Sequence, residues 1–140
     1  TMDAARILCE VLAVNDSCET DDLYVYQVRF CREYIAKEVA ADVFRSWVLS
    51  TDVEEQNFLF QSEIIDGDFL SDLMSGVLPS ITSKGRGFFG MGVKKPAVVN
   101  VLRTVLADMK DAYDLVQDIP DSYNKTTYMK WQADVDSLYQ

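Results

Sequence analysis

The spacing of apolar residues constrains the fold of this chain more than any other feature of its sequence. Apolar residues mostly recur at intervals of three and four, and alternation with a period of two is scarce. The first spacing gathers apolar side chains on one face of an α-helix, whereas the second would favour a β-strand. The sequence therefore predicts an all-α fold.

Turn residues divide this pattern into six to eight helices, and residues suited to cap a helix mark several of the starts. The expected helices are residues 3–14, residues 21–49, one opened by a capping box at Thr51–Glu54, one capped by Asp66 or Asp68, residues 97–116 with Pro96 in the first turn, and one capped by Asp121 or Ser122. Asp66-Gly-Asp68 lacks the further oxygen ligands of a calcium loop, so we interpret it as a helix cap.

The long second helix carries apolar residues on two faces. One face holds Leu23, Phe30, Tyr34, Ala41, Phe44 and Val48. The other holds Val28, Ile35, Val39 and Val43. Two apolar faces indicate a helix that is buried on one side and offers the other side to a partner.

Length and composition predict a single soluble domain over residues 1–140. Apolar residues make up 49% of the 140 residues and charged residues 26%, which is typical of a globular domain that needs no metal or disulfide for stability. Cys9, Cys18 and Cys31 lack the spacing of metal ligands, and we expect them to be reduced thiols. No apolar run of the sequence is long enough to span a bilayer.

The ionisable residues argue against nucleic-acid binding and against most catalytic designs. The chain has 23 acidic and 13 basic residues, and its net charge of −10 repels phosphate backbones. It contains no histidine, which is the commonest general base and metal ligand in proteins. We therefore expect a binding protein rather than an enzyme, with no cofactor.

The segment Gly85-Arg-Gly-Phe-Phe-Gly90 matches the G-x-G-x-x-G pattern of dinucleotide-binding turns. That pattern works between a strand and a helix of a βαβ unit, and no such unit is predicted here. Small residues also let neighbouring helices approach closely, and the region from Gly85 to Leu106 has the fewest charges. We expect this region to be the central, most buried element, and we keep nucleotide binding as a remote alternative.

Two segments resemble motifs of the Bcl-2 family, and more specifically of its divergent homologues in large DNA viruses. Residues 82–92 resemble the BH1 motif, because the pair Gly85-Arg86 precedes a stretch rich in Phe and Gly. Residues 131–139 resemble BH2, in which a Trp leads into a short helix that ends in Leu-Tyr. Ser-Lys stands before Gly85 where the family has Asn-Trp, and the usual Gly-Gly before the BH2 Trp is absent.

The first two helices extend the resemblance toward the N-terminus. The second helix carries a degenerate BH3-like pattern that runs from Val28 through Arg32-Glu33 to Ile35. The first helix stands where the family has its BH4 helix. The resemblance therefore covers most of the chain in the order of the family's motifs.

This resemblance implies an all-α, Bcl-2-like bundle of about seven to eight helices around a central apolar helical hairpin. It also implies a surface groove that accepts the amphipathic BH3 helix of a pro-apoptotic protein, a mode that uses apolar pockets at helical spacing. Arg86 would meet the aspartate of the bound helix. The implied groove residues are Arg86, Gly85, Ser83, Phe88, Tyr139, Ile35, Val39, Val43, Leu70 and Leu73.

The implied function is inhibition of apoptosis by sequestering BH3 helices of host proteins such as Bim, Bak or Bax. The implied location is the host cytoplasm, or the mitochondria if a C-terminal tail follows this sequence in the full protein. An acidic surface would suit BH3 helices rich in Arg and Lys. Two alternatives keep the fold: binding of signalling adaptors through another face, and a homodimer formed through an exposed apolar groove.

Overall fold

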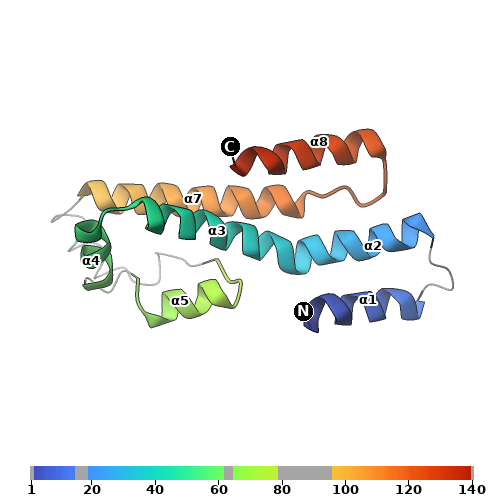
Figure 1. Cartoon of the computed structure of the whole chain (residues 1–140), viewed down its shortest axis with the longest axis horizontal. Coiled ribbons are helices and arrows are strands. Elements are labelled where there is room, and N and C mark those ends of the chain that lie inside the picture. Colours follow the sequence, from blue (N-terminus) through green and yellow to red (C-terminus); the bar gives the residue numbers. More distant parts are fainter. Residues whose placement is uncertain (1, 15–18, 62–64, 79–95, 140) are drawn as a thin grey trace. The chain divides into compact units, whose positions relative to one another are not determined.

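The computed structural model describes residues 2–14, 19–61, 65–78 and 96–139, and every regular element in these residues is helical. The elements are α1 (Met2–Val14), α2 (Thr20–Phe30), the π-helical turn η1 (Cys31–Ile35), α3 (Ala36–Ser50), α4 (Val53–Gln61), α5 (Gly67–Met74), α7 (Pro96–Gln117), α8 (Lys125–Asp136) and the 3-10 turn η3 (Ser137–Tyr139) (Figure 1). The all-α prediction is confirmed.

Helical residues continue without a break from Thr20 to Ser50. Counted with this run as one, the described residues hold six helices, slightly fewer than the seven to eight that the resemblance implies. The helix expected near Gly85 lies outside the described residues, and the Bcl-2-like arrangement stays a prediction. None of the described helices is both long and apolar enough to cross a membrane.

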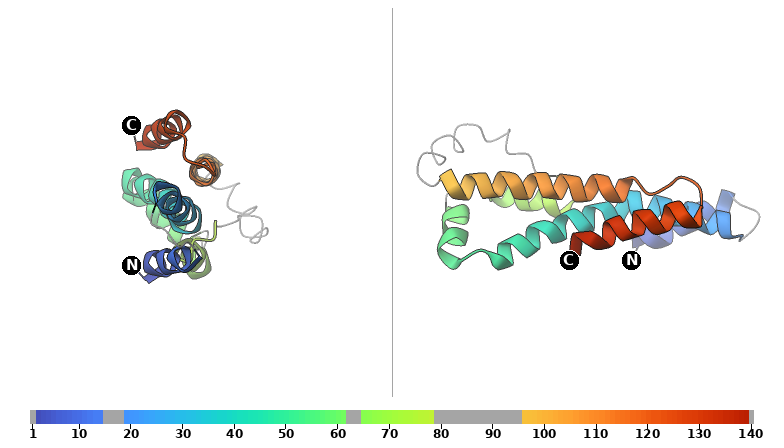
Figure 2. Two further views of the ribbon diagram at one scale, coloured as in Figure 1. Left: turned by 90° about the vertical axis from the view of Figure 1, so that its right-hand side faces the viewer. Right: turned by 90° about the horizontal axis from the view of Figure 1, so that it is seen from above.

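The chain forms two compact units. The terminal unit comprises Thr1–Ala36 and Ala112–Gln140, and the central unit comprises Lys37–Asp111. Within the terminal unit, α2 lies between α1 on one side and α8 on the other (Figures 1 and 2). Within the central unit, α3 lies next to both α5 and α7 in the same views. The prediction of a single domain over residues 1–140 stays a prediction.

Core residues of the terminal unit come from α1, α2, η1, the first residue of α3, the end of α7 and the segment that follows α7. The buried apolar side chains are Ile7, Val11, Tyr24, Val28, Cys31, Ala36, Ala112, Val116 and Ile119. The Tyr24 hydroxyl donates a hydrogen bond of 2.7 Å to the carbonyl of Pro120. The segment that follows α7 is therefore tied to α2 at Pro120.

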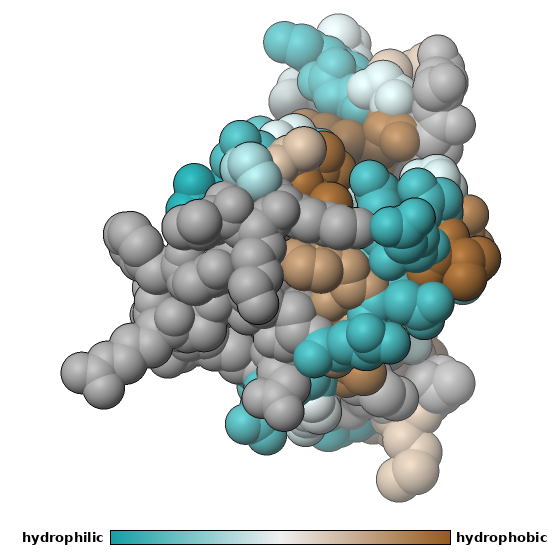
Figure 3. Space-filling model, turned by 90° about the vertical axis from the view of Figure 1, so that its left-hand side faces the viewer, coloured by the Kyte–Doolittle hydropathy of each residue, from teal (hydrophilic) through white to brown (hydrophobic). Residues whose placement is uncertain are grey.

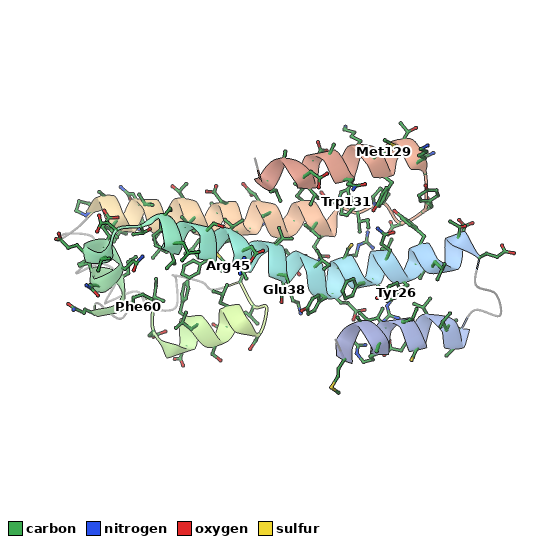
Figure 4. The ribbon with its side chains drawn as sticks, viewed as in Figure 1. Tyr26, Glu38, Arg45, Phe60, Met129 and Trp131 are labelled. Carbon is green, nitrogen blue, oxygen red and sulfur yellow. The ribbon has the colours of Figure 1, made fainter. Side chains whose placement is uncertain are left out.

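Helix α8 is attached to this core through half-buried polar and aromatic groups. Its Trp131 indole donates a hydrogen bond of 2.9 Å to the carbonyl of Leu115 in α7. The Gln27 amide of α2 donates a hydrogen bond of 2.6 Å to the Tyr128 hydroxyl. Figure 4 shows Trp131 on the inner side of α8 and Met129, which is 57% exposed, on its outer side.

The core of the central unit is built from α3, α4, α5 and the first part of α7. Its buried apolar residues are Val39, Ala40, Phe44, Leu59, Ile65, Phe69, Val98, Val99, Leu102, Val105 and Met109. The region from Gly85 to Leu106 was expected to be the most buried element. Its described part, residues 96–106, supplies four of these buried side chains, and the remainder lies outside the described residues.

The helix starts agree with the sequence to within a few residues, but two of the predicted caps are wrong. Asp66 caps α5 as expected, because its carboxylate accepts a hydrogen bond of 2.8 Å from the Phe69 N–H. At α4 the cap is Asp52 rather than Thr51, since Asp52 accepts from the Glu55 N–H at 2.9 Å. At α8 the cap is Asn124 rather than Asp121 or Ser122.

Candidate helix-binding surface

Helices α3 and α5 of the central unit run antiparallel and pack against each other. The rings of Phe44 and Phe69, near the end of α3 and the start of α5, lie 5.3 Å apart between centroids. At the opposite end, the side chain of Lys37 lies against Gly76, which follows α5. These two contacts fix the direction of α5 along α3.

The chain leaves α5 through a Schellman motif, which requires a left-handed residue just beyond the helix. Gly76 has a φ of +71° and takes that position. Its N–H donates to the Leu73 carbonyl at 3.1 Å, and the Val77 N–H donates to the Asp72 carbonyl at 2.9 Å. A glycine at this position therefore ends α5 sharply and lets the Lys37 side chain approach the backbone.

Four of the predicted groove residues lie on these two helices. Val39 is 6% exposed and belongs to the core, so it can offer little contact area to a ligand. Val43 and Leu73 are half-buried, and Leu70 is 37% exposed. The α3–α5 pair thus presents Val43, Leu70 and Leu73 as partly accessible apolar side chains on two packed helices.

Other apolar surface of the central unit lies around α4. Figure 3 views the chain from that side and shows apolar surface between polar side chains. The exposed apolar residues there include Val53 and Phe60 of α4 and Leu49, which is 78% exposed at the end of α3. Scattered exposed residues of this kind are ordinary in folded proteins, whereas the α3–α5 residues lie beside a well-packed helix contact.

Ile35, the remaining groove residue of the long helix, is half-buried in the π turn and belongs to the terminal unit. In an α-helix the Ala36 N–H would donate to the Arg32 carbonyl, but here it donates to the Cys31 carbonyl. The turn therefore contains one extra residue, which corresponds to roughly 100° of rotation in an α-helix.

Buried residues of the long helix come from both of its predicted faces. Before the turn the buried residue is Val28 of the second face, while Leu23 of the first face is exposed. After the turn Phe44 of the first face and Val39 of the second face are both buried, while Val43 of the second face is half-exposed. The prediction that one face is buried along the whole helix and the other is free is therefore wrong.

The residues that carry the BH1-like motif lie outside the described part of the chain. These are Ser83, Gly85, Arg86 and Phe88. Tyr139 of the BH2-like motif lies in η3, and its side chain is also outside the description. The charged contact assigned to Arg86 stays a prediction.

No family model, curated protein or solved structure matches this chain.

Arg32 has a structural role that the sequence did not reveal. Its guanidinium donates to the carbonyls of Gln117 and Ile119 at 3.0 and 2.8 Å. It also pairs with the Asp121 carboxylate at 2.8 Å. In return, the Gln117 side-chain amide donates a hydrogen bond of 2.6 Å to the Arg32 carbonyl. This carbonyl is available because the Ala36 N–H donates to Cys31 in the π turn.

The arginine thus caps the end of α7 and holds it against the π turn. In the sequence it appeared only as a replacement within a BH3-like pattern. Its partners stand 85 to 89 positions further along the chain, so no local signal could have identified them.

Two ionisable groups in the core of the terminal unit are kept neutral by burial. Burial raises the pKa of the Cys31 thiol. Burial also raises the pKa of Tyr24, with a smaller contribution from the neighbouring Tyr128. Both shifts favour the protonated form, so neither group is prepared to act as a nucleophile or base. Among the described residues, no group of His, Cys, Asp or Glu side chains could hold a metal ion.

Proposed function

We propose that this chain binds an amphipathic helix of another protein, and that this helix is a BH3 segment of a pro-apoptotic protein. The observation that carries the proposal is the α3–α5 pair. Its side chains Val43, Leu70 and Leu73 are partly exposed, and the two helices pack through the rings of Phe44 and Phe69. Helix-in-groove recognition uses apolar side chains presented in this way by neighbouring helices. The order and spacing of the BH1-like and BH2-like segments support the choice of ligand.

Charge around the α3–α5 pair also favours a basic ligand. Residues 37–78 contain nine acidic residues and two basic ones, Lys37 and Arg45. An acidic segment favours a helix rich in Arg and Lys over an acidic one. The single aspartate of a BH3 helix would then need a dedicated cation, and we assign that role to Arg86.

A binding function also agrees with the residues available for chemistry. The sequence contains no histidine, and burial keeps the Cys31 thiol protonated. We therefore propose sequestration of the ligand rather than a reaction on it. Inhibition of apoptosis in a host cell would follow from this sequestration.

The proposal is tested by titrating a fluorescent Bim-type BH3 peptide with the purified chain and measuring anisotropy. We expect saturable binding that Leu70→Glu and Leu73→Glu each weaken at least tenfold, because a buried carboxylate in the contact is costly. Arg86→Ala should weaken binding by roughly 1–3 kcal/mol. Leu49→Glu is the matched control, since Leu49 is 78% exposed at the end of α3 and should leave the affinity unchanged.

Circular dichroism of each variant separates a loss of binding from a loss of folding. The proposal fails if no BH3 peptide binds the folded chain. It also fails if the two α5 variants and the Leu49 control weaken binding equally, because the site would then lie elsewhere.

A further inference from the structure

Four charged side chains form a closed ring between α1 and the segment formed by α2 and η1. The Arg6 guanidinium lies 2.9 Å from one oxygen of Glu10 and 3.0 Å from one oxygen of Glu33. The Arg29 guanidinium lies 2.7 Å and 3.0 Å from the other oxygens of the same two carboxylates. Each carboxylate therefore bridges both arginines, and each arginine bridges both carboxylates.

This ring is open to solvent. Its four side chains are between 35% and 49% exposed. Exposed charge pairs are screened by dissolved ions, because the Debye length falls from about 30 Å at 0.01 M salt to about 3 Å at 1 M. The strength of the ring must therefore depend on ionic strength.

The apolar attachment of α1 rests on few side chains. Of its described side chains only Ile7 and Val11 are buried. Figure 4 draws Tyr26 on the side of α2 that faces α1, where it stacks on Phe30 with 5.8 Å between ring centroids. A helix of 13 residues has marginal stability in water without such contacts.

Helix α8 provides a contrast within the same unit. Its attachments to α2 and α7 include neutral contacts: the Trp131 hydrogen bond to Leu115, the Gln27 hydrogen bond to Tyr128, and the ring contact of Tyr128 with Tyr24. Neutral hydrogen bonds and ring contacts respond weakly to salt. The charged ring at α1 therefore depends on salt more strongly than these neutral contacts of α8.

We propose that α1 is an ionic strap, which salt releases from α2 as a separate step while α8 and the core of the terminal unit stay folded. The ring of Arg6, Glu10, Arg29 and Glu33 is the salt-sensitive contact that holds α1 against α2. Release exposes the apolar side chains of Ile7 and Val11 together with the α2 surface that they cover. The strap gives this unit a conformational response to ionic strength that is independent of helix binding by α3 and α5.

Hydrogen exchange of the full chain, measured by mass spectrometry, tests the strap. Between about 0.05 and 1 M NaCl we expect exchange of residues 2–14 to accelerate roughly three- to tenfold. Exchange of α8 should change less than twofold. Equal acceleration in both helices, or no acceleration in α1, would overturn the proposal.

Two ring variants and a control sharpen this test. The uncharged variant Arg6→Gln/Glu10→Gln/Arg29→Gln/Glu33→Gln should exchange rapidly in α1 at low salt and lose the salt dependence. The inverted variant Arg6→Glu/Glu10→Arg/Arg29→Glu/Glu33→Arg should recover both the protection and the salt response. Arg45→Gln, which removes the exposed pair with Asp42 on α3, should leave α1 unaffected. If the uncharged variant keeps the native salt response, the ring is not the contact that makes the attachment of α1 depend on salt.

Discussion

Gly76 shows how one residue sets the geometry of the α3–α5 pair. Its φ of +71° is strained for any residue with a side chain, and a Cβ atom there would collide with the Lys37 side chain. We expect Gly76→Ala to lower the free energy of unfolding by roughly 1–3 kcal/mol. Urea denaturation measures this loss.

Gly67 is the matched control, because a Cβ atom at Gly67 meets nothing within 4 Å at the start of the same helix. Gly67→Ala should change the stability by no more than about 0.5 kcal/mol. Equal losses in the two alanine variants would contradict the role assigned to the left-handed turn.

Glu10 and Glu33 link the strap to acid stability. Hydrogen bonds from Arg29 and Arg6 hold the pKa of both carboxyls below their ordinary value of 4.5. The folded state then binds fewer protons than the unfolded state, so the ring stabilises the fold fully above that value. This contribution is lost as the pH falls through the lowered pKa values.

Unfolding experiments at a series of pH values check this expectation. Between pH values of about 6 and 3, the urea midpoint of the native chain should fall more than that of Glu10→Gln/Glu33→Gln. A double variant with the same acid sensitivity as the native chain would show that the ring contributes nothing to pH-dependent stability.

Among the elements, the π turn couples two parts of the terminal unit that are distant in the sequence. The Arg32 carbonyl is available to accept a hydrogen bond from the Gln117 side chain. The Arg32 guanidinium donates to the carbonyls of Gln117 and Ile119 at and just beyond the end of α7. Arg32→Met keeps the apolar stem of the side chain but removes these contacts. We expect a loss of about 1–2 kcal/mol in unfolding free energy, discounted because the side chain is partly exposed.

A double-mutant cycle with Gln117→Ala tests whether the two residues act together. Their effects on unfolding should be less than additive, because each side chain donates to the other residue's backbone carbonyl and either substitution loosens the backbone position that the remaining hydrogen bond needs. Additive losses would contradict the reciprocal arrangement.

Helices were predictable from the sequence because apolar spacing and capping residues are local signals. The sequence offered Asp66 or Asp68 as the cap of α5, and Asp66 is the cap, which depends only on the following three residues. It failed at α8, where Asp121 is engaged by Arg32 from the other side of the unit and Asn124 caps the helix instead. The π turn was not predicted. The long helix has apolar residues on two faces, and this pattern is compatible with the helix both with and without one extra residue in a turn.

At the scale of the whole molecule, the chain consists of two compact units rather than one evenly distributed set of contacts. Sequence periodicity cannot divide residues 20–50 between units, because their helical pattern is uninterrupted. Of the predicted binding residues, Val43, Leu70 and Leu73 could be chosen from the sequence as apolar positions on helices. Their partial exposure could not be predicted, because it depends on how α5 packs against α3.

The most direct test of helix binding is to follow assigned backbone amide resonances of the full chain while a Bim-type BH3 peptide is added. We expect the largest shifts in residues 39–43 of α3, in residues 70–73 of α5 and at Arg86, with small changes in α1. Shifts confined to α1 or α8, or no shifts at saturating peptide, would contradict it.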